Sequence, residues 1–534
     1  MTILYESMNM TEGPHYPTHG TPVFAQNMVA TSQPLAAQAG LTMLASGGNA
    51  VDAALAAAIC LTVVEPTGCG LGSDAFAILW DGSQLHGLNA SGRAPAAWTP
   101  EQFNAGVPQR GWGAVTVPGA VSAWVALSKG HGRLPFAQLF EPAIGYARGG
   151  FPVSPTIAGL WAKGAELLKD QPGFAECFMP GGRAPKAGET FRNPALAASL
   201  EAIAESGGEA FYRGALAGKI AAAARANGAA LDEADMAAHK PDWCGTLQMP
   251  FRGYELHEIP PNGQGIAALI ALGLVDRTGV ANYGPDDPVA LHLQIEATKL
   301  ALVDADVHVG DTDSMAFGPE ALLSANYLDS RAALIDPRRA GDPGAGAPLA
   351  GGTVYLSAAD ADGRMVSFIQ SNYMGFGAGV VVPGTGIHMQ NRGAGFVATP
   401  GHPNRVGPSR RPFHTIIPGF VTKGGAPEMS FGVMGGPMQA QGHLQMMLRT
   451  MLWGQDPQAA SDAPRWQVVS GRKVAVENAM PDAIVEALRA MGHDVVREGT
   501  AAEFGFGGAQ LIRRMGDGYI GGSDHRKDGR VAGF

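Results

Sequence analysis

The residue of greatest chemical interest in this chain is Thr353, which follows the pair Gly351–Gly352. A Gly-, Pro- and Ala-rich stretch, residues 336–352, precedes it and is typical of an exposed linker. If the chain is cut after Gly352, Thr353 carries a hydroxyl and an α-amine on one residue. An α-amine has a pKa of about 7.7–8.0, so it can serve as the base for the neighbouring hydroxyl. The pattern therefore predicts amide-bond hydrolysis, against the simpler interpretation of Thr353 as a β-branched strand residue.

Two further glycines, Gly435 and Gly436, lie between an apolar run and a segment that reads as a helix beginning near Pro437. Their backbone N–H groups could form an oxyanion hole, which needs donors about 2.7–3.1 Å from the developing negative charge. The alternative is an ordinary strand-to-helix turn, in which proline suits the first helical position.

Several basic residues could bind an anionic substrate. Arg93 follows a predicted strand, so it could hold a carboxylate through two hydrogen bonds, or it could be a surface residue. Arg410 and Arg411 stand beside His414 and could supply an anion site or a titratable group, although adjacent arginines are usually solvated.

Two other motifs favour structural roles. The segment 68–73, GCGLGS, lacks the final glycine of a dinucleotide-binding loop and follows a helix, so close backbone packing is the better interpretation. Glu296 and Lys299 are one helical turn apart, which predicts a structural ion pair.

Composition narrows the class of protein. The 534 residues carry a net charge of −10 and contain no dense Lys/Arg run, which argues against a nucleic-acid partner. Four scattered cysteines imply neither a zinc site nor a disulfide framework. The most apolar stretch, residues 53–64, is shorter than the roughly 20 residues of a membrane span. The N-terminus lacks the basic and apolar regions of a secretory signal, so we expect a cytoplasmic protein.

The elements that must position these residues differ before and after Thr353. Helices are predicted over residues 34–44 and 49–64, and Ala-rich helical segments dominate the rest of the first part. Residues 353–371 read as two strands joined by a tight turn, and more strands follow. Helices first and strands later, around one core, suggest strands sandwiched by helices.

Long segments resemble the γ-glutamyltransferase family of N-terminal-nucleophile hydrolases. They include the opening helices, MVATSQPLAAQAGLTMLASGGNAVDAALAA, the middle segments PPNGQGIAAL and EATKLALVDADVHVGD, the strand TVYLSAADADGRMVSF, and VVPGTGI, VGPSRRP and GGSDHRKDG. The resemblance implies an α+β, four-layer αββα sandwich, made as a precursor that cuts itself. The products would be a helix-rich large subunit, residues 1–352, and a strand-rich small subunit, residues 353–534, which stay together as one domain.

The resemblance also assigns catalytic roles without any metal or organic cofactor. Thr353 matches the nucleophile, and the bond to Gly352 matches the cleavage site. Ser371 matches a second hydroxyl that bonds to the nucleophile, and Gly435 and Gly436 match the oxyanion glycines.

The substrate pocket departs from the family's glutamate-recognising pattern. Tyr373 stands at the position of an Asn, Ala394 at that of an Asp, and His414 and Thr415 at those of two Ser, while Arg93 is a candidate for the family's Arg. Loss of the Asp leaves no obvious partner for a buried ammonium group. The chain thus resembles the subgroup with oxamate amidohydrolase and cephalosporin-acylase-like members. We expect a small-molecule amide whose acyl part bears a carboxylate, met by Arg93 or His414.

Two alternatives stay open from the sequence. One is a γ-glutamyl hydrolase or transferase acting on glutathione, and the other is a non-catalytic relative that binds a metabolite. Whether the heterodimers pair again is also left open.

Overall fold

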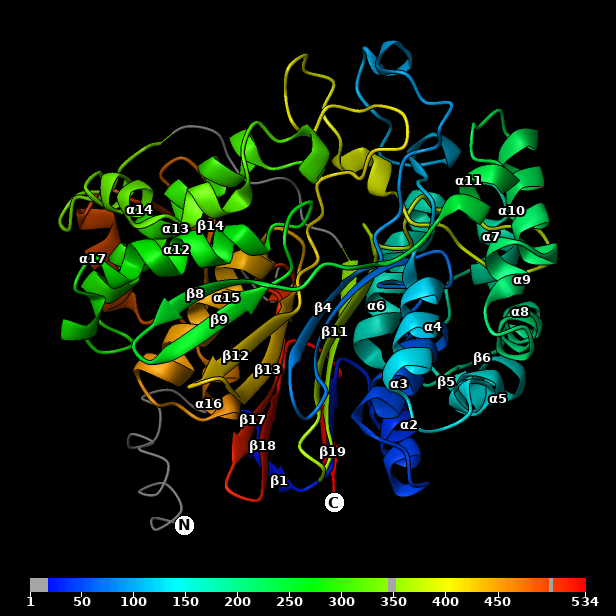
Figure 1. Cartoon of the computed structure of the whole chain (residues 1–534), viewed down its shortest axis with the longest axis horizontal. Helices are drawn as coiled ribbons and strands as arrows, with labels where there is room; N and C mark the ends of the chain where they lie inside the picture. Colours follow the sequence, from blue (N-terminus) through cyan, green and yellow to red (C-terminus); the bar gives the residue numbers. More distant parts are fainter. Residues whose placement is uncertain (1–17, 344–351, 499–502) are drawn as a thin grey trace.

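Two seven-stranded antiparallel sheets lie face to face at the centre of the molecule, and helices cover both outer surfaces (Figure 1). This computed structural model describes residues 18–343, 352–498 and 503–534, so residues 344–351 of the predicted linker lie outside the described residues. The expected α+β architecture with four αββα layers is confirmed.

The first sheet contains, in spatial order, β1 (Val23–Ala25), β18 (Gly518–Ser523), β17 (Gly508–Met515), β13 (Ala426–Met434), β12 (Gly419–Lys423), β9 (Tyr254–Glu258) and β8 (Leu247–Phe251). The second contains β19 (Arg530–Gly533), β2 (Met28–Thr31), β10 (Gly352–Ala359), β11 (Met365–Tyr373), β3 (Asp74–Trp80), β4 (Leu85–Asn89) and β7 (Asp242–Trp243). Each sheet contains strands from both sides of Thr353, so the predicted large and small subunits share one fold.

The helices divide into two layers by position in the chain. Those beside the second sheet are α2 (Pro34–Ala45), α3 (Ala50–Val64), α4 (Ala120–His131), α5 (Glu141–Gly149), α6 (Pro155–Leu168), α7 (Phe174–Phe178), α8 (Pro194–Glu205), α9 (Glu209–Tyr212), α10 (Ala215–Ala226) and α11 (Glu233–Ala238). Those beside the first sheet are α12 (Gly265–Asp276), α13 (Pro288–His308), α14 (Ala325–Ala332), α15 (Met438–Met447), α16 (Pro457–Asp462) and α17 (Asp482–Ala490). Two smaller sheets join β5 (Phe151–Pro152) to β6 (Thr190–Phe191), and β14 (Trp466–Ser470) to β15 (Lys473–Glu477) and β16 (Asp494–Glu498).

Strand β10 is buried on both faces, which explains its nearly continuous apolar sequence. Val354 and Leu356 belong to the core shared with α2 to α10, whereas Tyr355 belongs to the core between the sheets. On β11, Ile369 belongs to the same inter-sheet core. Because side chains alternate along a strand, residues 353 and 371 are on the inter-sheet side of their strands.

The opening helices form for the reasons that the sequence indicated. Pro34 occupies the first turn of α2, and Asn49 caps α3 by accepting hydrogen bonds from the N–H groups of Val51 and Asp52. Every residue of α3 is buried, and the helix packs against β10 and β11. No helix among the described residues is long and apolar enough to cross a membrane.

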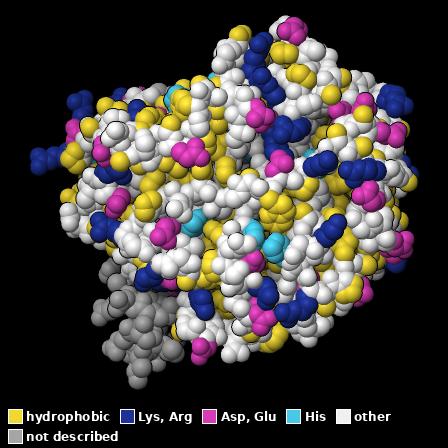
Figure 2. Space-filling view, viewed as in Figure 1, with side chains coloured by type: hydrophobic (Ala, Val, Ile, Leu, Met, Phe, Trp, Pro, Cys, Tyr) yellow, Lys and Arg dark blue, Asp and Glu magenta, His cyan; other side chains and the backbone are white. Residues whose placement is uncertain are grey.

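Side chains of opposite charge are interspersed on the face of the molecule drawn in Figure 2, without a continuous basic surface there. Such a face offers no extended track for a phosphate backbone.

The glycines of the segment 68–73 serve close packing, as the sequence suggested. A Cβ on Gly70 would lie 2.7 Å from ring nitrogens of His388, and a Cβ on Gly72 would lie 2.9 Å from the Cα of Met389. The segment therefore packs closely against residues 388 and 389, which follow β11 in the chain.

We expect Gly72→Ala to lower the free energy of unfolding by about 1–3 kcal/mol, because its methyl group would collide with backbone rather than with a movable side chain. The midpoint of thermal unfolding measures the effect. Gly130→Ala is the matched control, since nothing lies within 4 Å of the added atom in α4 and alanine favours a helix. Equal midpoints for the two variants would contradict the packing role.

Candidate active site

The hydroxyl groups of Thr353 and Ser371 meet across the β10–β11 pair. Their oxygens are 3.1 Å apart, and both residues are buried. The backbone N–H of Tyr373 donates to the Ser371 Oγ at 2.8 Å, which fixes this hydroxyl beside Thr353. The predicted pairing of the two hydroxyls is thus present in the fold.

The backbone is irregular at this end of the hairpin. Gly352 pairs with Tyr373, but the register shifts between Gly352 and Val354, so Thr353 sits at a bulge. Tyr373 has φ of 78°, in a region that a bulky residue rarely adopts. Distortion of this kind clusters at functional sites, where the surrounding structure holds it in place.

Gly435 and Gly436 connect β13 to α15, with φ values of 133° and 60°. The predicted strand-to-helix turn is correct, and its left-handed backbone requires glycine. A Cβ on Gly435 would lie 2.9 Å from the Cα of Gly507, so the turn is also tightly packed.

Gln264 fixes this turn, a role that the sequence did not reveal. Its side-chain amide donates to the carbonyl oxygens of Gly436 at 2.8 Å and Thr415 at 2.5 Å. It stands just before α12, within the segment PPNGQGIAAL. The orientation of the Gly436 peptide therefore depends on a side chain of another layer.

Arg392 is the main residue that the sequence analysis missed. Its guanidinium is fully buried, lies 4.5 Å from the centre of the Tyr373 ring and donates from Nη1 to the Thr415 hydroxyl at 2.9 Å. Its Nε and Nη2 have no hydrogen-bond partner among the described residues. Burial lowers the Arg392 pKa to about 10, with Asp74 opposing the shift, so the group is cationic at neutral pH. Nothing in the pattern NRGAG distinguishes such an arginine from an exposed one.

The imidazole of His414 contacts the carboxyl group of Asp74, with 3.1 Å between Nε2 and Oδ2. Burial, together with Arg392 and Arg411, holds the pKa of His414 well below its usual value. Burial raises the Asp74 pKa to about 7, although Arg392 pulls it down. The His414 imidazole is therefore neutral and buried, and its Nε2 already contacts the Asp74 carboxyl group.

A cavity of about 250 Å³ opens beside these residues. Tyr373 and Pro437 line it at the catalytic end, and Asp306 is exposed at its rim. The rest of the wall is formed by Gln264, Leu302, Ala305, Val309, Ala394, Gly395, Phe396, Val397, His402, Asn404 and Phe413. The wall is mainly apolar, so it suits a modest, largely apolar substituent.

The other predicted arginines are engaged elsewhere. Arg93 donates to Asp311 and to the Ser409 carbonyl, and it lines a separate cavity that also contains Asp235 and Asp242. Arg411 forms an ion pair with Asp242. The described contacts thus join Tyr373 to the Ser371 hydroxyl. Gln264 and Arg392 join Thr415 to the glycine turn and to the Tyr373 ring, whereas no contact among the described residues brings Arg93 there.

Among the residues that the structure describes, two clusters hold donor atoms close enough together for a metal ion, and each has a cation nearby. One contains His292, Glu296 and His493. The Lys299 ammonium lies 2.7 Å from Glu296 and 3.4 Å from His493, so this cluster is already neutralised and the predicted Glu296–Lys299 ion pair is confirmed. The other contains Asp81, His86 and His131, beside a cavity that Arg133 and Arg364 also line. Neither cluster supplies a residue to the wall of the 250 Å³ cavity.

Paired hydroxyls at the start of a central strand and αββα layers are features expected of an N-terminal-nucleophile amide hydrolase. The sequence profile described as Gamma-glutamyltranspeptidase matches residues 36–534, and the chain belongs to this family. It is therefore a self-processing amidohydrolase made as a proenzyme.

Individual relatives are similar over almost the whole chain. The glutathione hydrolase-like YwrD proenzyme of Bacillus subtilis is 36% identical, covering 95% of this chain and 98% of its own length. The oxamate amidohydrolase proenzyme of Klebsiella pneumoniae is also 36% identical, covering 97% and 100%. The solved cephalosporin acylase from Bacillus halodurans shares 48% identity with a TM-score of 0.93, covering 98% of this chain and 99% of that one.

Proposed function

We propose that the chain is cut between Gly352 and Thr353 and hydrolyses amides whose acyl part carries a carboxylate but no α-ammonium group. The observation that carries the choice of substrate is Arg392, a buried cation beside the site with two unpartnered donor nitrogens among the described residues. A guanidinium with free donors matches a carboxylate in geometry and charge. The same cation repels an α-ammonium group, which disfavours a γ-glutamyl substrate.

The catalytic cycle follows from the positions of the hydroxyls and glycines. After cleavage, the Thr353 α-amine accepts the hydroxyl proton and the oxygen attacks the amide carbonyl. The N–H groups of Gly435 and Gly436 stabilise the oxyanion, and the proton passes from the ammonium to the leaving amine. Water then hydrolyses the ester, and Ser371 keeps the nucleophile oriented throughout.

The sequence suggested that Arg93 or His414 binds the substrate carboxylate. The proposal assigns this role to Arg392 instead. Arg93 already pairs with Asp311, and His414 is neutral and bonded to Asp74. Oxamate-like and dicarboxylate-derived acyl groups are the substrate classes that fit, and the apolar cavity wall accepts the remainder of the amide.

A panel of amides tests the proposal. We expect kcat/KM for oxamate or glutaryl anilide to exceed that for γ-glutamyl anilide by about 100-fold or more, because one buried charge repulsion costs several kcal/mol. Butyryl anilide, which lacks any charge, is the matched control for glutaryl anilide. Equal rates for the glutaryl and γ-glutamyl anilides would refute the choice of substrate, and a chain that remains a single band on a denaturing gel would favour the non-catalytic alternative. The cytoplasmic location and any pairing of heterodimers stay predictions.

A further inference from the structure

A buried carboxyl group and a buried amine, Glu65 and Lys527, act on each other electrostatically and take no part in the mechanism described above. Both side chains are almost completely buried. Glu65 follows α3 and accepts a hydrogen bond from the Ser32 hydroxyl at 2.6 Å. Burial raises the Glu65 pKa to about 7 and lowers the Lys527 pKa to about 7, while each charge opposes the shift of the other. Because each charge acts on the other, the two groups do not titrate independently.

Glu65 reaches the start of β10. An atom at the Cβ position of Gly68 would lie 3.3 Å from Glu65 Oε1 and 3.4 Å from the carbonyl carbon of Thr353. The partner of Glu65 is also close to this strand, because Ser32 follows Thr31, which pairs with Leu356. The carboxyl group therefore lies beside the nucleophile residue.

Lys527 packs against the first sheet, where β17 begins. Its Cγ lies 2.6 Å from a Cβ position on Gly508, the first residue of β17. Gly508 pairs with Met434, and its neighbour Gly507 packs against Gly435. The side chain therefore lies beside the strand end that meets the Gly435–Gly436 turn, and its charge acts on Glu65.

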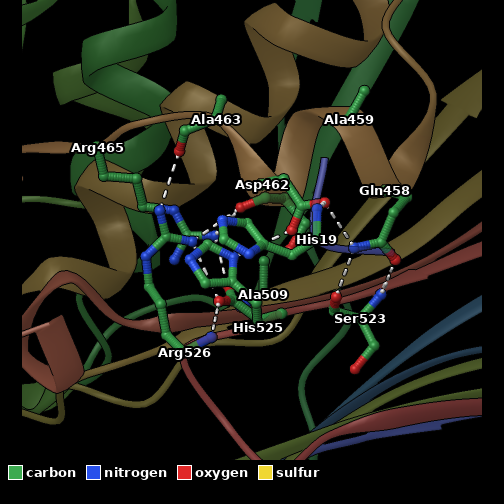
Figure 3. A network of polar contacts seen from close by, with 12 residues as sticks. His19, Gln458, Ala459, Asp462, Ala463, Arg465, Ala509, Ser523, His525 and Arg526 are labelled. Carbon is green, nitrogen blue, oxygen red and sulfur yellow. Dashed lines mark hydrogen bonds and ion pairs between the residues drawn. The ribbon is translucent and has the colours of Figure 1, made fainter. Parts of the chain in front are cut away.

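The chain that carries Lys527 is held firmly. Figure 3 shows the adjacent residues: His525 contacts Asp462 at 3.0 Å, and Arg526 donates to the Ala463 carbonyl at 3.0 Å. Asp524 accepts from Arg465 at 2.5 Å. These contacts hold the backbone just before Lys527 in place.

We propose that Glu65 and Lys527 act as a positioning pair that sets the charge around the Thr353 α-amine, keeping it neutral before attack and accommodating it as an ammonium afterwards. The inference rests on the proposed role of Thr353. One proton moves from the Thr353 hydroxyl to its amine and then to the leaving amine, so the pair gains and loses none over a turnover. Lys527 disfavours the ammonium form and Glu65 favours it, and their opposite effects balance.

Other charged groups face the pair. Asp528 acts on Glu65, whereas Asp524, Arg465 and Arg526 act on Lys527. Cys69 also faces Glu65, but burial keeps its pKa well above the usual value, so it is a neutral thiol. The other four groups remain in each variant below and provide a constant background.

Removing one partner should shift the α-amine pKa in a direction that depends on which charge is left. Lys527→Met leaves Glu65 as the remaining group, which is neutral or negative. The α-amine pKa should therefore rise, and the midpoint of the acid limb of the pH profile of kcat/KM should move to higher pH. Glu65→Gln leaves Lys527, which is neutral or positive, so the α-amine pKa should fall and the midpoint should move to lower pH. We expect shifts of about 0.5–1 unit, below the 1–3 units of a fixed neighbouring charge, because the remaining partner can neutralise itself. The double variant should return close to the wild type.

The amine can also be titrated without a substrate. Cyanate carbamoylates neutral amines, and mass spectrometry of the peptide that begins at Thr353 gives the rate against pH. Its midpoint should move as the kinetic limb does, and Glu65→Asp should move it the same way as Glu65→Gln but less. The matched control is the buried pair Glu296 and Lys299, whose Gln and Met variants should leave the midpoint in place.

Each outcome decides a different claim. Shifts of the same sign in both single variants, or none in either, would overturn the role of the pair while leaving the nucleophile intact. A missing Thr353 N-terminal peptide in the wild type would instead overturn the proposed cleavage. Loss of activity without a moved midpoint would mean a purely structural role.

Discussion

Thr353→Ala is expected to remain a single uncut chain of 534 residues with no measurable amide hydrolysis. Alanine removes both the oxygen that attacks the Gly352–Thr353 bond and the nucleophile of the mature enzyme, so both reactions stop together. Removal of a covalent nucleophile typically costs about 10⁴-fold or more in kcat. A denaturing gel and intact mass measure the first effect, and an anilide assay the second.

Two further variants distinguish the role of the nucleophile from that of the neighbouring hydroxyl group. Thr353→Ser keeps a hydroxyl and should still be cut, more slowly because the lost methyl group leaves the side chain less restricted. Ser371→Ala removes the hydroxyl that is 3.1 Å away, and it should slow cleavage without abolishing it. Two fragments matching residues 1–352 and 353–534 from Thr353→Ala would show that another residue is the nucleophile.

Arg392→Leu should lower kcat/KM for a carboxylate-bearing amide by about 10²–10³-fold, since a buried charge pair loses one partner. The kcat/KM for butyryl anilide should change by less than about fivefold, because the butyryl group has no carboxylate to bind the guanidinium. Arg392→Lys should recover only part of the loss, since lysine keeps the charge but not the paired donors. Steady-state kinetics on the two anilides provide the comparison.

Arg93→Leu decides between the assignments from sequence and from structure. Arg93 is bound to Asp311 and lines another cavity, so its loss should leave the ratio of the two rates unchanged. If Arg93→Leu abolishes the preference for the carboxylate and Arg392→Leu does not, the sequence-based assignment is the right one. Thermal unfolding of both variants controls for stability, because deleting a fully buried arginine can also disturb Tyr373 and Thr415.

The local elements could be predicted because their signals are local. Pro34 and Asn49 mark helix starts through backbone groups one to three residues away, and the alternation along β10 and β11 reflects the two cores that they separate. The glycine turn at Gly435 was recognisable for the same reason. Thr353 was predicted as the nucleophile from one residue, its neighbours and the resemblance of the surrounding segments.

The residue proposed to bind the substrate carboxylate could not be predicted from local signals. Arg93 and Arg392 each stand in a short polar segment, and no neighbouring residue tells which is buried. Their partners are distant in the chain: Asp311 for one, and Thr415 with the Tyr373 ring for the other. A side chain's charge state and free donors depend on such contacts, which only the packed fold creates.

By itself, the sequence determined the chemistry of this protein: a threonine that can become an N-terminal nucleophile, a glycine turn to receive the oxyanion, and the layers that carry them. The tertiary structure alone decided what surrounds that threonine. It placed Arg392 beside Tyr373 and Thr415, and it placed His414 against Asp74. It also brought Glu65 and Lys527, 462 positions apart in the chain, close enough for each charge to act on the other. Backbone geometry and strand pattern are set by near neighbours, whereas recognition and protonation are set by desolvation and by charges that folding brings close.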